Sequence, residues 1–507
     1  MLTNASDFRC DAPPPGRRDT RRLRLLTSTR FALVFLVVAG GCAKPERDAG
    51  FEDVHRNVAD RIGHEVRWNR GTDEDEQAAS AVRGLLRREL DANAAVQVAL
   101  LSNRDIQATY EQLGVAQADL VQAGLLRNPI FVGDLWFFKY GGNFELSITQ
   151  NFIDVFLVGL RKRAAAAAFQ ASKARVTNAV INLAADARAA FYTYQAAAQT
   201  LEMRRSIAAA TRSASELAER INAAGNMTDL DLHNERALAA QSQLDLTASE
   251  AAVVEARERL NELMGLSGPD TGWTAPARLP DLPAAEASAD GIEERAVAES
   301  LDLEAAARDV DAARERLGMA RPMAVFGDSD VGFTTQAESG GTWGYGPAFS
   351  LPIPLFDQGT PAAARAAAEL RAAQQRQAAL AVRVRARTRA AVARALAARS
   401  RARQYKLDVL PLRQQIVEET HREYNGMLVG TFQLLTAKQQ QIEAGRQSIE
   451  ALRDYWLART ELDRLVGGRL PPAGAAATAP AATSMPGPAE HEGQAEHGGH
   501  VEHQAGG

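Results

Sequence analysis

The chain has 507 residues, with 58 Lys and Arg, 63 Asp and Glu and a formal net charge of -5. So small a charge excludes a nucleic-acid binder, which would carry a strong basic excess. Long stretches rich in Ala, Arg, Gln and Glu favour long helices, and the length suits several ordinary domains or one very elongated one.

The N-terminal segment 1–41 is predicted to be a secretory signal peptide. Its basic stretch "RRDTRRLRLL" precedes the apolar run "FALVFLVVA", which is too short for a spanning helix. The following "VAGGC" resembles a bacterial lipobox, with Cys42 as the lipidated first residue of the mature protein. The alternative is cleavage near Gly41 that leaves Cys42 unmodified. Cys10 then lies in the removed segment, and the two cysteines form no metal-binding or redox pair.

No other run in the chain approaches the apolar length that a spanning helix needs. An exported protein of this kind is soluble, lipid-anchored or a β-barrel. We expect residues 42–92 to form an N-terminal extension that packs on the outside of the molecule.

The rest of the chain reads as two copies of one unit, 93–266 and 292–468. "GNMTDLDLHNERALAAQSQLDLTA" begins at Gly225, and the similar "GMLVGTFQLLTAKQQQIEA" begins at Gly426. "RERLNELMGL" ends one half and "RTELDRLVGG" ends the other. Self-similarity at this scale indicates two copies of a supersecondary unit.

Each unit is predicted to contain the same elements in the same order. A moderate helix (93–126 or 292–319) precedes two strand-like segments, which follow Pro129 or Pro322. A very long helix (158–223 or 361–423), a turn and a last helix complete the unit, and the last helix stops at Gly265 or Gly467. Pro411 is expected to kink the second long helix. A Pro- and Gly-rich linker, 267–291, separates the halves, and 469–507 is expected to be a disordered His-rich tail.

The strand-like segments alternate between apolar and polar residues. Trp343, Tyr345 and Phe349 alternate with small residues, and Phe144, Leu146 and Ile148 alternate with polar ones. This pattern suits a half-buried soluble sheet or a membrane barrel. Four strands cannot close a conducting barrel, whereas three chains would give twelve strands and an aqueous lumen.

The predicted long helices exceed what a globular domain requires. About 65 residues at about 1.5 Å each span roughly 100 Å, a length that suits a bridge across the periplasm. A solvated coiled coil is the alternative, but the Ala-rich stretches keep no strict heptad.

On these features the chain resembles the TolC family of bacterial outer-membrane efflux channels. The repeat, the strand ending in "SLPIPLFDQG", the "NP" before the first strand and the Gly-marked reversals carry the resemblance, which covers residues 93–467. "VADRIGHEVRW" (58–68) and "ATYEQLGVAQADLVQAGLLRNP" (108–129) look most like members that export heavy-metal cations.

The resemblance implies a mainly α fold with a small β part. Each protomer would contribute a long α-helical barrel and four strands of a trimeric, twelve-stranded transmembrane β-barrel. The homotrimer would sit in outer-membrane lipid, extend into the periplasm, and dock on a periplasmic adaptor and an inner-membrane pump of the resistance-nodulation-division type. It would be a passive conduit with no cofactor. The sequence shows no nucleophile elbow, phosphate loop or HExxH motif, so we expect no enzyme.

Two sites follow as hypotheses. Asp229 and Asp231 come just after the Gly225 turn, where rings of carboxylate would form a periplasmic gate that favours cations. The alternative is that they are ordinary helix N-terminal acids; the second half carries Thr431 and Gln433 there. In the tail, clustered His with Glu suits a metal such as Zn, but a solvated tail without a role is the alternative. The four histidines concerned are His491, His497, His500 and His503.

Three functions remain open from the sequence. The first is export of heavy-metal cations through an outer-membrane channel. The second is export of drugs or other organic compounds through the same kind of channel. The third, from a different class, is a periplasmic coiled-coil structural lipoprotein, which would lack the alternating strands.

Overall fold

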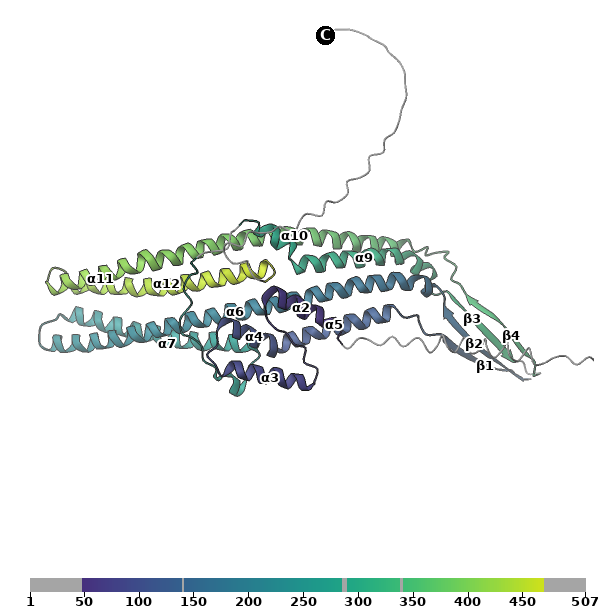
Figure 1. The fold of residues 1–507 in the computed structure, drawn as a ribbon, viewed down its shortest axis with the longest axis horizontal. Coiled ribbons are helices and arrows are strands. Elements are labelled where there is room, and N and C mark those ends of the chain that lie inside the picture. The colour runs from purple at the N-terminus through teal and green to yellow at the C-terminus, as the bar shows by residue number, and fades with distance from the viewer. Residues whose placement is uncertain (1–47, 139–140, 285–289, 338–340, 469–507) are drawn as a thin grey trace, which may run out of the picture.

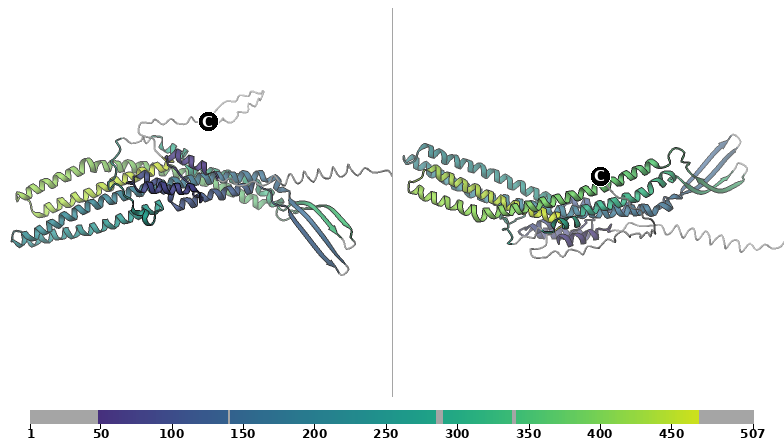
Figure 2. Two further views of the ribbon diagram at one scale, coloured as in Figure 1. Left: turned by 60° about the horizontal axis from the view of Figure 1, so that its bottom comes forward. Right: turned by 90° about the horizontal axis from the view of Figure 1, so that it is seen from above.

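Two copies of one helical unit build an elongated molecule in the computed structural model, which describes residues 48–138, 141–284, 290–337 and 341–468. A four-stranded sheet lies at one end and two helical hairpin tips lie at the other (Figure 1). The helices between them run along the long axis, and Figure 2 shows the same arrangement from two further sides.

The two units contain corresponding elements, preceded by two N-terminal helices. The N-terminal pair and the first unit comprise α2 (Phe51–Ile62), α3 (Asp73–Leu86), α4 (Ala92–Ser102), α5 (Arg104–Ala123), β1 (Ile130–Phe138), β2 (Gly141–Asn151), α6 (Ile153–Ala223) and α7 (Asp229–Met264). After the short 3-10 helix η1 (Gly268–Gly272), the second unit comprises α8 (Ile292–Ala298), α9 (Leu301–Phe326), β3 (Asp330–Ala337), β4 (Trp343–Ser350), α10 (Thr360–Gln404), the π-helical turn η2 (Tyr405–Val409), α11 (Leu410–Asn425) and α12 (Thr431–Leu465).

Helix α6 is the element on which most others pack. Its 71 residues span about 105 Å. Toward the sheet it lies between α5 and α9, with α10 beyond α9; toward the tips it lies between α7 and α12, with α11 beyond α12 (Figure 1). Small residues such as Ala171 and Ala174 are buried where α6 meets Ala305 of α9, so the two backbones approach closely.

The predicted helix 93–126 is divided in two at Asn103. The side-chain Oδ1 of Asn103 accepts a hydrogen bond from the backbone N–H of Ile106, which starts α5. Its Nδ2 donates to the carbonyl of Leu263, 2.9 Å away, at the end of α7. An asparagine that caps a new helix and binds a distant carbonyl favours a break that hydrophobic periodicity does not reveal.

The prediction that a strand begins soon after Pro322 is wrong, because α9 continues to Phe326. Proline lacks an N–H group, but the helix carries on past it, and Gly327 still donates to the carbonyl of Met323. The third strand therefore begins only at Asp330.

The predicted kink at Pro411 appears as a π-helical turn just before it. Pro411 lies in the first turn of α11, directly after η2. Because Pro411 has no N–H to donate to a carbonyl in the preceding turn, that turn is free to adopt the wider π geometry. No such turn interrupts α6, so the two long helices differ.

Glycines end the last helix of each unit, as the sequence predicts. Gly265 and Gly467 both adopt left-handed backbone conformations, with φ of 65° and 79°. A Cβ at Gly265 would lie 2.6 Å from the carbonyl oxygen of Ser102, and one at Gly467 would lie 3.1 Å from that of Glu299. Only glycine satisfies both the conformation and the space.

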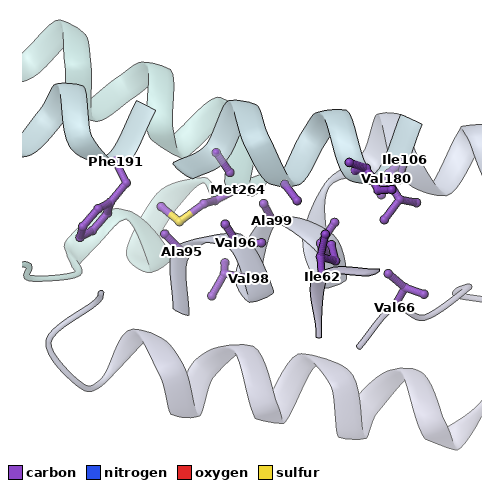
Figure 3. Close-up of a cluster of buried hydrophobic side chains, with 14 of the residues drawn as sticks. Ile62, Val66, Ala95, Val96, Val98, Ala99, Ile106, Val180, Phe191 and Met264 are labelled. Atoms are coloured by element: carbon purple, nitrogen blue, oxygen red, sulfur yellow. The ribbon is translucent and has the colours of Figure 1, made fainter. Parts of the chain in front are cut away.

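The main hydrophobic core lies where the N-terminal helices cover one side of α6. In Figure 3, Ile106 lies beside Val180, and Ile62 and Val96 lie lower in the same cluster. Trp273 and Leu279, from the segment that joins the two units, belong to the same core. The extension predicted to pack on the outside therefore adds a second layer to one side of the helical wall.

Candidate channel surfaces

The four strands form an antiparallel meander in the order β1-β2-β3-β4. Residues paired across the strands share a face, and one register row joins Phe131, Ile148 and Phe333. This face is almost entirely apolar, and its large side chains are exposed, Tyr345 by 80% and Phe137 by 87%. Its other large members are Leu135, Phe144, Leu146, Val331, Trp343 and Phe349.

The opposite face of the sheet is mostly polar. Glu145, Ser147 and Thr149 alternate with the apolar row of β2, as the sequence predicts. The Thr334 hydroxyl donates to Glu145 Oε1 across β2 and β3, at 3.0 Å. Val132 and Trp136 also lie on this face, which explains why the first strand alternates less clearly. A sheet with one exposed apolar face and one polar face suits a boundary between an apolar environment and water.

Both outer strands have one unpaired side. Within the described residues, β1 pairs only with β2, and β4 pairs only with β3. Each therefore presents a row of backbone N–H and C=O groups that another strand would satisfy.

A buried ion cluster fixes the sheet to α6. Asp154, in the first turn of α6, is only 1% exposed, and its carboxylate lies 3.1 Å from Arg161 Nη1 and 3.2 Å from Arg127 Nε. Asn151 accepts a hydrogen bond from the backbone N–H of Asp154 and donates to the carbonyl of Gly327. The cluster therefore joins both units at the point where strands become helices.

The two predicted gate residues lie at the tip between α6 and α7. Asp229 Oδ1 accepts a hydrogen bond from Asn222 Nδ2 at 3.0 Å. Asp231 accepts from the hydroxyl of Thr228, which in turn caps the helix by accepting from the backbone N–H of Asp231. Both carboxylates thus accept local side-chain hydrogen bonds that hold the turn between α6 and α7, and Asp229 is exposed.

The tip between α11 and α12 has a different chemical character. Met427, at 94% exposure, adopts a left-handed backbone conformation with φ of 59°. Leu428 and Phe432 are also exposed beside it. The tip between α6 and α7 therefore carries carboxylates beside the exposed Leu230, whereas the tip between α11 and α12 presents mainly apolar side chains.

Several predicted sites lie outside the described residues. These are the signal peptide, Cys42, and the tail histidines His491, His497, His500 and His503. Within the described part, no group of three or more His, Cys, Asp or Glu side chains is arranged to hold a metal ion. Among the helices of that part, none is long and apolar enough to cross a membrane.

Comparison with solved structures gives a consistent result. Neither a protein-family model nor a curated protein matches the sequence. The fold is similar to the CmeC outer membrane channel of Campylobacter jejuni, with a TM-score of 0.65, 14% identity, and coverage of 74% of this chain and 85% of that one. The outer-membrane channel OprN gives 0.63 at 17% identity, with 85% and 97% covered. CusC, a protein studied for transmembrane channel formation, gives 0.59 at 16% identity, with 75% and 93% covered.

The chain has the TolC-like fold. The fold class expected from the resemblance is therefore confirmed for the single protomer: long paired helices in two repeats, with a small four-stranded sheet.

The TolC-like chain also carries a basic groove that the sequence analysis missed. On α10, Arg383, Arg387, Arg394 and Arg401 recur at intervals of four and seven residues, which places them on one helical face. The first two line a hollow of about 150 Å³ and the last two a hollow of about 730 Å³, and Arg464 of α12 lines both. The spacing of the α10 arginines can be read from the sequence, but the contribution of Arg464 from α12 cannot.

Proposed function

We propose that the chain is one subunit of a TolC-family outer-membrane efflux channel. The observation that carries this proposal is a sheet with an exposed apolar face, a polar face and two unpaired edges, attached to helices about 100 Å long. Four strands from each of three copies would give a twelve-stranded barrel, in which every edge finds a partner.

In this assembly the helices would continue the barrel as a periplasmic tunnel. The hairpin tips would meet a periplasmic adaptor, and an inner-membrane pump of the resistance-nodulation-division type would supply the energy. Cys42 would carry the lipid anchor after removal of residues 1–41. The proposal assigns the chain no catalytic step and no cofactor.

Heavy-metal cations are the first candidate cargo. Residues 58–68 and 108–129 resemble members that export such cations, and the His-rich tail offers nitrogen ligands of the kind that Zn binds. Residues 58–68 belong to the layer that covers α6, whereas 108–129 lie largely in α5, beside α6 in the helical wall. The first segment therefore bears on family membership rather than on the passage itself. Organic compounds are the second candidate, and the basic groove on α10 favours those that are anionic.

Asp229 and Asp231 are proposed to close the periplasmic entrance and to favour cations there. Three copies would bring six carboxylates to one ring, where their field would act on passing ions. In the protein reconstituted in planar bilayers, Asp229→Asn with Asp231→Asn should then lower cation preference and increase the open fraction. Helix-capping acids without a gate role would leave both quantities unchanged.

The assembly is tested by fractionation. We expect the protein in outer-membrane fractions, as a trimer whose mobility on a denaturing gel changes with heating, and we expect conductance steps after reconstitution. A protein that is monomeric and water-soluble once Cys42 is replaced by Ser would instead indicate the periplasmic structural lipoprotein. Growth of a deletion strain across Zn, Co, Cd, Ni, Cu and Ag tests the metal cargo separately, and sensitivity to none of them would contradict it.

A further inference from the structure

The basic groove introduced above is defined by Arg383, Arg387, Arg394 and Arg401 of α10 and Arg464 of α12; we call it the arginine groove. Helix α10 has an unusual charge balance, because arginine recurs along its length and Glu369 is its single acidic residue. From Arg383 to Arg401 the groove extends about 27 Å along the helix.

Most acidic side chains that line the groove are already neutralised. Glu461 pairs with Arg464 at 2.6 Å, and Asp454 pairs with both Arg401 and Arg453. Glu299 pairs with Arg61 at 3.2 Å, from outside the groove. Asp302 accepts a hydrogen bond from Asn178.

Three guanidinium groups are left without such a partner. Within the described residues, Arg383, Arg387 and Arg394 form no ion pair, although all three are exposed side chains that line hollows. Asp302, whose hydrogen bond comes from the neutral Asn178, and Asp186 of α6 both act electrostatically on Arg464 and are the remaining acids nearby. The groove therefore carries a surplus of positive charge, and this charge comes from residues on a single helix, α10.

The other side of α10 shows that this surplus is a property of one face. Arg385 and Arg389 alternate with the groove arginines, and both approach Glu293 of α8, Arg389 at 2.9 Å. Arg399 donates to the carbonyl of Pro283 in the segment that joins the units. Arginines on that face therefore have structural partners, whereas Arg383, Arg387 and Arg394 of the groove form no ion pair within the described residues.

The groove lies on the side of the helical wall away from the added layer. On α12, Trp456 donates to the carbonyl of Pro280 in the joining segment. Asp454 and Ala458, two residues to either side, point the opposite way and line the groove. Because a tube conducts only if its bore is clear, the added layer belongs outside the proposed channel and the groove faces its interior.

We propose that the arginine groove binds multivalent anions, as oxyanions or carboxylates, on their way through the channel. This inference rests on the proposed function for its location, but its chemistry rests on the groove alone. A planar guanidinium binds carboxylate or phosphate oxygens through two parallel hydrogen bonds, and it stays charged at any physiological pH. A row of such groups in a confined passage concentrates anions and repels free cations.

The test measures binding and conduction separately on the full-length protein in detergent or bilayers. By calorimetry, inorganic tripolyphosphate and citrate should both bind, more weakly as salt rises. Arg387→Gln with Arg394→Gln should raise the dissociation constant by about tenfold. The matched control, Arg371→Gln with Arg403→Gln, removes the same charge from the opposite side of the same helix and should leave binding unchanged. Arg387→Lys with Arg394→Lys should restore part of the affinity.

The inference would be overturned if the affinity for each probe were the same in the parent, groove and control proteins, or if the parent protein bound neither probe. In bilayers under a salt gradient, the groove variant should favour cations more strongly than the parent channel does, while the control keeps the parent's ion preference. Conductance steps with the same ion preference in every variant would overturn the anion site and leave the channel proposal standing. A folded protein that binds both anions but never conducts would contradict the channel proposal and support the groove.

Discussion

Asp154 and Arg161 form a buried ion pair where the sheet meets α6, with 3.1 Å between Oδ1 and Nη1. Replacing Asp154 by Ala leaves Arg161, only 18% exposed, without its counter-charge, so we expect a loss of about 3–5 kcal/mol in the free energy of unfolding. Thermal unfolding of the detergent-solubilised protein measures it. The matched control is Asp357→Ala at the equivalent position of the second unit. Asp357 is exposed, and within the part of the chain that the structure describes its carboxylate accepts one hydrogen bond, from the backbone N–H of Gly359. Its loss should therefore cost about 1 kcal/mol or less. Equal effects would contradict the special role of the cluster.

The apolar face of the sheet should tolerate charge far less than the polar face. Phe333 and Gln336 lie on β3 and point to opposite faces. Phe333→Arg should cost about 2–4 kcal/mol if the apolar face contacts lipid, and Gln336→Arg should cost little. The measurement is the fraction of protein recovered as a heat-modifiable trimer from outer membranes. If both variants assemble equally well, the apolar face does not contact lipid.

Gly332 is predicted to be essential for joining the two units through β2 and β3. A Cβ at this position would lie 2.1 Å from the carbonyl oxygen of Ile148, which is backbone that cannot move aside cheaply. Gly332→Ala should therefore destabilise the sheet by about 1–3 kcal/mol and reduce trimer yield. Gly346→Ala, on the same face of β4, meets no atom within 4 Å and is the control. A normal yield for Gly332→Ala would mean that β2 and β3 pair differently.

Acid should loosen the contact between α2 and α6. Lys173 donates to Asp53 at 2.7 Å, and this hydrogen bond is the main reason that the pKa of Asp53 lies below its ordinary value of 3.8. Because the folded pKa is the lower one, the pair stabilises the protein above about pH 4 and loses this effect as the pH falls through the folded pKa.

The size of that effect is limited by solvent, because the Asp53 side chain is 47% exposed, and we expect at most about 1 kcal/mol. Unfolding temperatures of the parent protein and of Asp53→Asn should differ above pH 4, and the difference should shrink as the pH falls below 4 through the folded pKa. A constant difference across that range would show that the ion pair is not the cause.

The sequence predicts most of this fold because its strongest signals are local and occur twice. The alternation in 144–149 and 343–349 gives both the strands and their faces, and Gly265 and Gly467 mark true helix ends. The errors arise where tertiary contacts override local chemistry. Asn103 divides a helix by binding Leu263, far along the chain, and Pro322 is accepted within α9.

The candidate sites were less predictable, for a related reason. Asp229 and Asp231 were found because they follow a recognisable turn, but their hydrogen bonds to Asn222 and Thr228 depend on the folded hairpin. The arginine groove needs α10 and α12 side by side, which brings Arg394 near Arg464, 70 positions further along the chain. Spacing along one helix reveals a row of charge, but only packing shows which members have been neutralised.

The open edges of β1 and β4 also determine when folding ends. In the proposed assembly, a single chain in the lipid bilayer would leave backbone groups unsatisfied along both strands. It would therefore have no stable folded state by itself. The last folding step would then be a meeting between copies, and its rate would rise with their concentration. A cell that makes too few copies would accumulate unfinished chains, vulnerable to proteases, rather than fewer finished channels in simple proportion.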